Sequence, residues 1–361
     1  MVKRTIWLSA EIREEIEEIL LILERTPLDA DEILVDAPKS VLATMNLPAA
    51  VAGARVVAVP YSYATGISVP DKLRSLVSFS WRLVRRRPIM VFSGFSMMKH
   101  RLAAWLTRVP HAAYIRGVVF DPEVVVGISD KLRFGALRRL VPRRIVATYW
   151  ADAVLTIGEL NRQFLRGRGL SDQAIHVVGP VWLDGSSSAE RAGDAGDRGN
   201  RGTAYFVTGA WEAHGRSEEH EAQLRITRRL AGEWRGTKRF ALRVHPRDNY
   251  PYETDPAFAR VELNRDLPGD FLTSLTADDV LITPLSTLAF EALHLGRTVV
   301  FYADPVATKA YFHMYERLGI DARSIDEILD GDLSSTRPAV EVFSRVDFDT
   351  ASAALAGLVR R

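Results

Sequence analysis

The segment 278–302, DDVLITPLSTLAFEALHLGRTVVFY, constrains the fold of this chain more than any other stretch. Residues 280–282 and 298–302 are short apolar runs, typical of strands that are buried on both faces of a sheet. Between them, Ser286 and Thr287 predict the start of a helix that ends near Gly296. A strand, a helix and a second strand in this order predict two parallel strands joined by a crossover helix.

The same alternation of strands and helices runs through the rest of the chain. The first half predicts strands at 5–8, 32–35, 55–59, 89–92, 112–119, 154–157 and 175–178, with helices at 11–24, 40–45, 70–85, 96–106, 129–149 and 159–166. The second half predicts further strands at 204–208, 240–244 and 259–263, with helices at 217–233, 268–275, 306–318 and 350–359. This alternation predicts α/β sheets of parallel strands that helices cover on both faces.

One segment interrupts this pattern and predicts the domain boundary. Residues 184–202, DGSSSAERAGDAGDRGNRG, contain almost no apolar side chains, which indicates a flexible linker or loop. We therefore expect an N-terminal domain at 1–183 and a C-terminal domain at 203–361. The last helix is a candidate to pack back on the first domain.

Composition bounds the class of protein. With 361 residues, 47% hydrophobic and 25% charged, the chain is typical of a soluble globular protein of two domains. The absence of cysteine excludes disulfides, thiolate metal sites and a cysteine nucleophile, and it fits a reducing cytoplasm. No apolar run reaches the roughly 18 residues of a membrane span, and the N-terminus turns acidic too soon for a signal peptide. We therefore expect a cytoplasmic protein.

The net charge of +2 is unevenly distributed. Arginines cluster at Arg82 and 85–87, and basic residues cluster again at 131–144, mixed with apolar side chains in both places. These clusters indicate contact with an anionic membrane surface or a polyanionic acceptor, whereas the alternative is a set of solvated helix faces. Peripheral membrane contact is therefore an expectation, and no nucleic-acid partner is expected.

Candidate binding residues follow three strands of the second half. Ligands of open α/β sheets bind beyond the carboxyl ends of the strands. This rule selects Gly209, the turn His245-Pro246-Arg247, and the helix start at Ser286 and Thr287. A histidine, an arginine and free helix N–H groups all suit a phosphate, and Glu291, one turn further, suits a ribose diol. The alternative is that these are ordinary turns and a capped helix.

Candidate acid–base residues lie in the first half. The candidates to deprotonate an acceptor hydroxyl are two carboxylates and a histidine: Asp121, Glu11 and His100. The alternative is that they are surface or capping groups. Several motifs are absent from the sequence: the P-loop, G-x-G-x-x-G after the first strand, G-x-S-x-G and H-E-x-x-H. No motif therefore indicates a P-loop NTPase, a dehydrogenase, an esterase or a zinc enzyme.

Three segments resemble a known group of enzymes. Residues 151–181 resemble the segment that closes the N-terminal domain of many GT-B glycosyltransferases. VHP at 244–246 and PLSTLAFEAL at 284–293 resemble the His-Pro and Ser/Thr motifs of bacterial sialyltransferases, polysialyltransferases and related capsule-type transferases. The resemblance implies a GT-B fold, in which two Rossmann-like domains face each other across a cleft. The N-terminal domain would bind the acceptor and the C-terminal domain the nucleotide-sugar.

The resemblance also implies roles for particular residues. His245, Ser286 and Thr287 would hold the nucleotide phosphate, and Glu291 would hold the ribose. The paired-acid-glycine motif that supplies the base in the sialyltransferases is absent, and residues 120–123 (FDPE) are only a loose substitute. The resemblance implies no metal, because protein groups stabilise the leaving phosphate in GT-B enzymes. It implies no cofactor either, since the nucleotide-sugar is a co-substrate.

The function that these observations predict is sugar transfer from a nucleotide-sugar to a hydroxyl of a cell-surface glycan or lipid-linked acceptor, as in polysaccharide or capsule synthesis. A CMP-sugar is the first expectation, with UDP- and GDP-sugars left open. Two alternatives remain: a nucleotide-sugar epimerase of the same architecture, and a non-catalytic glycan-binding protein.

Overall fold

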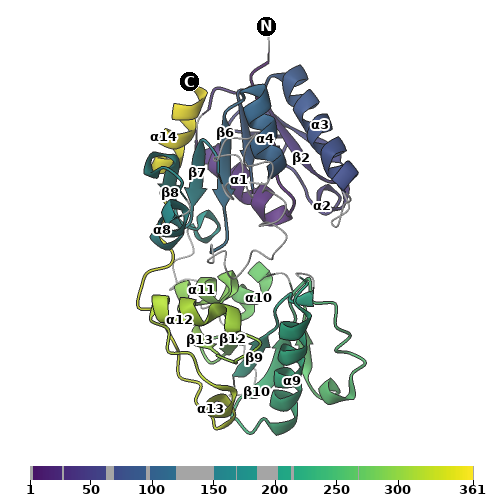
Figure 1. Ribbon diagram of the computed structural model, residues 1–361, viewed down its shortest axis with the longest axis vertical. Coiled ribbons are helices and arrows are strands. Elements are labelled where there is room, and N and C mark those ends of the chain that lie inside the picture. Colours follow the sequence, from purple (N-terminus) through teal and green to yellow (C-terminus); the bar gives the residue numbers. More distant parts are fainter. Residues whose placement is uncertain are drawn as a thin grey trace. The chain divides into compact units, whose positions relative to one another are not determined.

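The computed structural model describes residues 3–26, 28–61, 69–94, 98–118, 150–167, 169–184, 202–212, 215–266 and 268–360. The described chain forms two compact units (Figure 1). One unit holds the residues up to 184 together with 342–360, and the other holds 202–341. Each unit is a mostly parallel sheet with helices, so the predicted α/β fold class is confirmed.

The first unit is built on an eight-stranded sheet. Its order is β3 (Ala50–Val51), β4 (Ala54–Tyr61), β2 (Glu32–Pro38), β1 (Thr5–Ser9), β5 (Met90–Ser93), β6 (His111–Ile115), β7 (Ala153–Thr156) and β8 (Ile175–Val177). All pairs are parallel except β3 with β4. Every residue of β1, β5, β6 and β7 is buried, which explains why these strands read as continuous apolar runs in the sequence.

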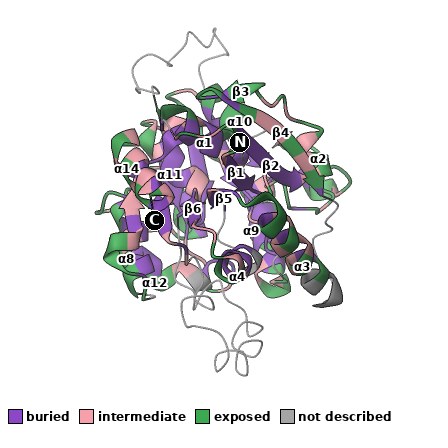
Figure 2. Ribbon diagram, turned by 90° about the horizontal axis from the view of Figure 1, so that it is seen from above, coloured by how far each residue is buried: buried purple, intermediate pink, exposed green. Residues whose placement is uncertain are grey.

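Helices cover both faces of this sheet. They are α1 (Arg13–Arg25), α2 (Lys39–Leu42), α3 (Val69–Arg86), α4 (Met98–Thr107), α8 (Glu159–Gly167) and α14 (Phe348–Val359). Seen from above, α3 and α4 lie on one side of the strands, and α1 and α14 lie on the other (Figure 2). Phe79 and Leu83 of α3 pack against Trp7 of β1 and Val91 of β5, so this helix is fixed on the sheet by its buried side.

The C-terminal segment belongs to the first unit. Ser344 N donates to Ile157 O at 3.0 Å, and Asp347 N donates to Val178 O at 2.9 Å. The backbone of Val342 passes so close to Gly158 that a Cβ there would overlap it. Helix α14 then packs on α1, so the segment after residue 341 adds a final layer to the first unit.

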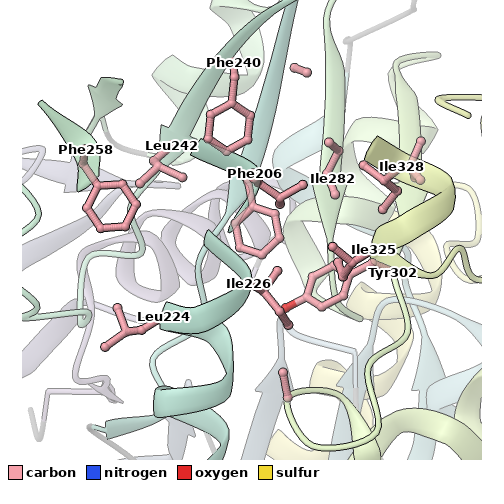
Figure 3. Close-up of a cluster of buried hydrophobic side chains, with 14 of the residues drawn as sticks. Phe206, Leu224, Ile226, Phe240, Leu242, Phe258, Ile282, Tyr302, Ile325 and Ile328 are labelled. Atoms are coloured by element: carbon pink, nitrogen blue, oxygen red, sulfur yellow. The ribbon is translucent and has the colours of Figure 1, made fainter. Parts of the chain in front are cut away.

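The second unit is a sheet of five parallel strands. Their order is β11 (Glu262–Asn264), β10 (Arg239–Arg243), β9 (Thr203–Val207), β12 (Val280–Thr283) and β13 (Thr298–Phe301). The helices are α9 (Ser217–Glu233), α10 (Pro268–Ser274), α11 (Thr287–His294), α12 (Phe312–Leu318) and α13 (Ile325–Leu329). Strand residues Phe206 and Ile282 meet Ile226 of α9 and Ile325 of α13 in a buried cluster (Figure 3).

Some predicted boundaries were wrong. The helix predicted at 306–318 begins only at Phe312, after a 3₁₀ turn at Lys309–Tyr311. Asp304 explains the delay, because its Oδ1 accepts the N–H groups of Val306 (2.9 Å) and Ala307 (2.7 Å) in a turn. The sequence did not predict strand β3 or helix α13. The predicted helix at 129–149 and the predicted linker, apart from its end residues, lie outside the described residues.

Among the described residues, no helix combines the length and the apolar character that a membrane span requires.

Candidate functional site

Three predicted binding residues lie at one edge of the second sheet. Strands β10, β9 and β12 are adjacent and parallel, and they are followed by His245, Gly209 and Ser286 respectively. The carboxyl ends of parallel strands share one edge, which is where ligands of such sheets bind. The structure therefore brings together residues that are far apart in the sequence.

His245 is fixed by the ends of two strands. Its N–H donates to Thr208 Oγ1 at 2.9 Å, and Thr208 N–H donates to Arg243 O at 3.0 Å. Its Nδ1 accepts the N–H of Arg247 at 3.0 Å. Because Nδ1 accepts, the neutral ring carries its proton on Nε2, which can donate to an oxygen of an anion.

The buried residue Asp248 fixes the loop that carries His245 through hydrogen bonds. Asp248 N–H donates to His245 O at 2.8 Å, and its carboxylate accepts the Tyr252 hydroxyl at 2.9 Å. Burial, together with the Asp248 charge, raises the pKa of Tyr252 well above its ordinary range, so this hydroxyl stays a donor. Pro246 and Arg247 lie exposed on the outside of the loop.

The helix start at Ser286 has the predicted form. Ser286 is the N-cap of α11, and its Oγ accepts Ala289 N–H at 3.2 Å. Ser286 and Thr287 are both partly exposed, so the start of this eight-residue helix is open to a ligand. Glu291 is buried within the unit, and its predicted contact with a ribose stays a prediction.

Gly209 lies against an indole that the sequence analysis did not select. A Cβ at Gly209 would lie 2.9 Å from Trp211 Nε1, and Gly209 N–H donates to Gln223 Oε1 at 2.6 Å. Trp211 is 6% exposed, and its Nε1–H has no hydrogen-bond partner among the described residues. A buried donor of this kind at the carboxyl edge can be satisfied by a ligand oxygen. The sequence signal for it is a tryptophan two residues after a strand-end glycine.

The predicted acid–base residues of the first unit have different surroundings. Glu11 is exposed before α1, and Asp121 lies outside the described residues. His100 is buried, with its Nε2 at 3.0 Å from Ser9 Oγ, and Ser9 Oγ donates to Asp36 Oδ2 at 3.2 Å. His100 therefore belongs to a buried polar network under the sheet edge, and the role of all three as bases stays a prediction.

Glu15 is an acid–base candidate that the sequence analysis missed. It lies in the first turn of α1, just beyond β1, and packs on Gly94, which directly follows the neighbouring strand β5. Burial raises the pKa of Glu15 from 4.5 to about 7, with the Glu11 charge adding to the rise and the Arg116 charge opposing it. A carboxyl group with this pKa exchanges a proton near neutral pH.

A cation lies at the same edge. Arg116 follows β6, the next strand after β5, and its Nε donates to Glu18 Oε1 at 2.5 Å. Its guanidinium also lies over the ring of Trp182, with 4.7 Å between its carbon and the ring centroid. Two partners thus hold Arg116 in place. The carboxyl edge of the first sheet combines an acid–base group with a fixed positive charge.

The described residues contain no group of three His, Asp or Glu side chains that could hold a metal ion. The expectation of a metal-independent site, without a cofactor, stays a prediction.

Comparison with known proteins identifies the fold. No protein-family model and no curated protein sequence matches the chain. The structure is similar to the UDP-GlcNAc 2-epimerase of Neisseria meningitidis bound to UDP-GlcNAc, with a TM-score of 0.63 and 13% identity over 99% of this chain and 100% of that one. The UDP-GlcNAc 2-epimerase of Methanocaldococcus jannaschii in complex with UDP-GlcNAc and UDP is similar with a TM-score of 0.62 and 14% identity, over 99% of this chain and 100% of that one. A glycotransferase of kitacinnamycin is similar with a TM-score of 0.50 and 14% identity, over 99% of this chain and 91% of that one.

These similarities show a GT-B-type α/β fold, as the sequence analysis predicted. At identities of 13% and 14% they establish the fold alone. The resemblance to sialyltransferases and capsule-type transferases stays a prediction.

Proposed function

We propose that the protein is a nucleotide-sugar epimerase, with the nucleotide bound at the carboxyl edge of the second sheet. The observation that carries the proposal is the convergence of His245, Trp211 and the start of α11 on that edge. All three present N–H donors, and the phosphates of a nucleotide-sugar present only acceptors. The described site thus has the chemistry of an anion site built from fixed donors.

Each donor has a distinct role in this proposal. His245 donates through Nε2 to a phosphate oxygen, because its Nδ1 is occupied by the backbone N–H of Arg247. The positive end of the α11 dipole, at the partly exposed Ser286 and Thr287, favours the same charged group. The absence of a side chain at Gly209 leaves the Trp211 indole in place as a third donor.

Epimerisation removes a proton from one face of a sugar carbon and delivers a proton to the opposite face of the same carbon, so it needs one group that accepts a proton and a second that donates one. We propose Glu15 of the first unit as one of these two groups, since a carboxyl with a pKa of about 7 is half ionised at neutral pH. The neighbouring Arg116 charge favours the ionised form and keeps the pKa from rising further. The proposal therefore assigns the anion site to the second unit and one acid–base group to the first.

Similarity to solved structures favours an epimerase over the transferase that the motifs predict. Both bacterial and archaeal UDP-GlcNAc 2-epimerases align with this chain over their full length. Two of these structures contain UDP-GlcNAc, so UDP-GlcNAc is the first substrate to test.

The test is turnover of UDP-GlcNAc without any acceptor, followed by proton NMR of the sugar. We expect the epimer to appear until the two forms reach equilibrium, with no free nucleotide accumulating in proportion. Unchanged UDP-GlcNAc, together with the absence of nucleotide binding in a thermal-shift screen of UDP, CDP, CMP and GDP, would reject the proposal.

Sugar transfer is the second candidate, and the His-Pro and Ser/Thr motifs at 244–246 and 284–293 favour it. A transferase consumes its donor only when an acceptor hydroxyl is present, or slowly by hydrolysis. A CMP-sugar is the donor to test, because the motif resemblance is to CMP-sugar enzymes. Nucleotide release that depends on an added glycan acceptor would select this candidate over the epimerase.

A further inference from the structure

The outer face of α3 exposes three large apolar side chains. Val77, Trp81 and Val84 are 60%, 58% and 57% exposed. Their spacing of four and three residues places them on one stripe of the helix. Phe79 and Leu83 of the same helix are buried against the sheet. Helix α3 is therefore apolar on two sides, and the core uses only one of them.

Basic side chains surround this stripe. Arg74, Arg85, Arg86 and Arg87 are all exposed, and the sequence from 73 to 87 contains no acidic residue. The guanidinium of Arg85 lies over the Trp81 ring, 5.2 Å from its centroid. Apolar residues with a tryptophan, bordered by arginines, are typical of a helix that lies in the headgroup region of a membrane.

A small cavity adjoins the stripe on its core side. Its volume is about 200 Å³, and its lining combines aromatic and aliphatic side chains with basic ones: Trp7, Leu34, Val59, Trp81, Arg82, Arg85 and Arg86. Arg82 forms an ion pair of 3.1 Å with Asp36, whereas Arg85 and Arg86 pair with no carboxylate among the described residues, so these two supply the positive charge of the cavity. An apolar recess beside cations suits a molecule with an anionic head and an apolar chain.

We propose that the α3 face, defined by Val77, Trp81, Val84 and the exposed arginines, docks on an anionic lipid bilayer. The apolar stripe enters the interface between headgroups and chains, while the arginines contact lipid phosphates. A second copy of this chain is a poor occupant, because a two-fold contact would place these arginines against each other. A nucleic acid would match the arginines but would leave Val77 and Val84 without an apolar partner.

The test is sedimentation of the full chain with lipid vesicles at moderate salt. We expect binding to vesicles that mix phosphatidylglycerol with phosphatidylcholine, and little binding to phosphatidylcholine alone. Arg85→Glu with Arg86→Glu should weaken binding at least about twentyfold, since each arginine near an anionic surface contributes about a fivefold factor. Trp81→Ser should weaken it about tenfold by removing the inserted ring.

A matched control carries the same charge change elsewhere. Arg235→Glu with Arg260→Glu alters two exposed arginines of the second unit and should leave vesicle binding within about twofold of the unaltered protein at moderate salt. Three results would overturn the proposal: no binding to anionic vesicles, equal binding to neutral vesicles, or equal losses in both charge variants. A dimer in light scattering that Arg85→Glu with Arg86→Glu dissociates would assign the α3 face to a second copy instead.

Discussion

At the residue scale, Gly209 offers the sharpest probe of the proposed nucleotide site. In Gly209→Ala, the new Cβ would lie 2.9 Å from Trp211 Nε1 and 3.0 Å from Trp211 Cε2, so the indole must move. We expect a loss of stability of about 1 to 3 kcal/mol, as for other overpacked sites, and weaker binding of UDP. Urea unfolding measures the first effect, and titration calorimetry measures the second.

Gly232→Ala is the control for this change. A Cβ at Gly232, in the last turn of α9, meets no atom within 4 Å. Alanine there should stabilise the protein by about 0.5 to 1 kcal/mol through helix propensity and leave UDP binding unchanged. Equal UDP affinity in both glycine variants would remove Trp211 from the site.

Glu15 links stability to pH. Its pKa is raised from 4.5 to about 7 in the folded protein, so the folded state binds more protons than the unfolded state between these values. Stability from this group is therefore present below pH 4.5 and is lost as the pH rises through about 7. Glu15→Gln should raise the free energy of unfolding at pH 8 by about 1 to 3 kcal/mol, reduced for partial exposure, and by almost nothing at pH 4.

The same variant separates a catalytic role from a structural one. If Glu15 exchanges the proton, Glu15→Gln should lower turnover by at least about a hundredfold while UDP binding stays unchanged. Glu11→Gln is the matched control, because Glu11 is exposed and one of the residues that the sequence predicts as a base. A larger loss of turnover in Glu11→Gln would favour the sequence-based choice over Glu15.

Residues differ in how far the sequence could reveal them. His245 and Ser286 come within three residues of the end of an apolar strand, so their place at a sheet edge follows from local pattern. In the sequence, Glu15 is one of several acidic residues on a helix. Its pKa is raised by burial, which depends on tertiary packing such as its contact with Gly94 of another strand-end loop. From the sequence alone, Trp211 looks like an ordinary core aromatic residue. Only the structure shows that its Nε1–H lies beside Gly209 without a hydrogen-bond partner among the described residues.

At the element scale, the start of α11 is the part of the site that can be tested by its cap. Ser286→Ala should cost about 1 kcal/mol of stability, because Ala289 N–H loses its side-chain partner and keeps only the backbone oxygen of residue 286, and should also weaken UDP binding. Ser324→Ala is the matched cap variant, since Ser324 caps α13 through Glu327 N–H. It should cost similar stability without changing UDP affinity. If Ser286→Ala and Ser324→Ala change the affinity for UDP equally, the start of α11 contacts no ligand.

The sequence predicts the strands of the two sheets where an unbroken apolar run marks them. Buried parallel strands such as β5 and β12 read as unbroken apolar runs, and turn residues bound them. The two-residue strand β3 gives no periodic signal, and the five-residue helix α13 depends on its capping box at Ser324 and on packing against α9. Short elements of this kind are determined by tertiary contacts more than by their own sequence.

At the scale of the whole molecule, each unit has its own core and its own proposed role. Nucleotide binding should therefore protect the second unit selectively in hydrogen exchange. We expect slower exchange at 208–212, 245–248 and 286–289 with UDP present, and a smaller change in β1 of the first unit. Protection confined to the first unit would place the nucleotide elsewhere and contradict the proposal.

The return of the chain to the first unit was predicted only as an option for the last helix, and the structure shows what decides it. Residues 350–359 predict a helix, but its position is decided by the close approach of Val342 to Gly158 and by the hydrogen bonds of Ser344 and Asp347. These contacts join residues that are distant in the sequence and carry no motif. Local pattern could only offer the return as one possibility.

The central claim is that His245 helps to bind a nucleotide at the carboxyl edge of the second sheet. Titration calorimetry of UDP and UDP-GlcNAc against the unaltered protein, His245→Ala and His313→Ala tests it directly, since His313 is an exposed histidine of the same unit. We predict that His245→Ala weakens binding by about ten- to a hundredfold, the value of a hydrogen bond to a charged group, and that His313→Ala does not. Unchanged affinity in His245→Ala would contradict the account.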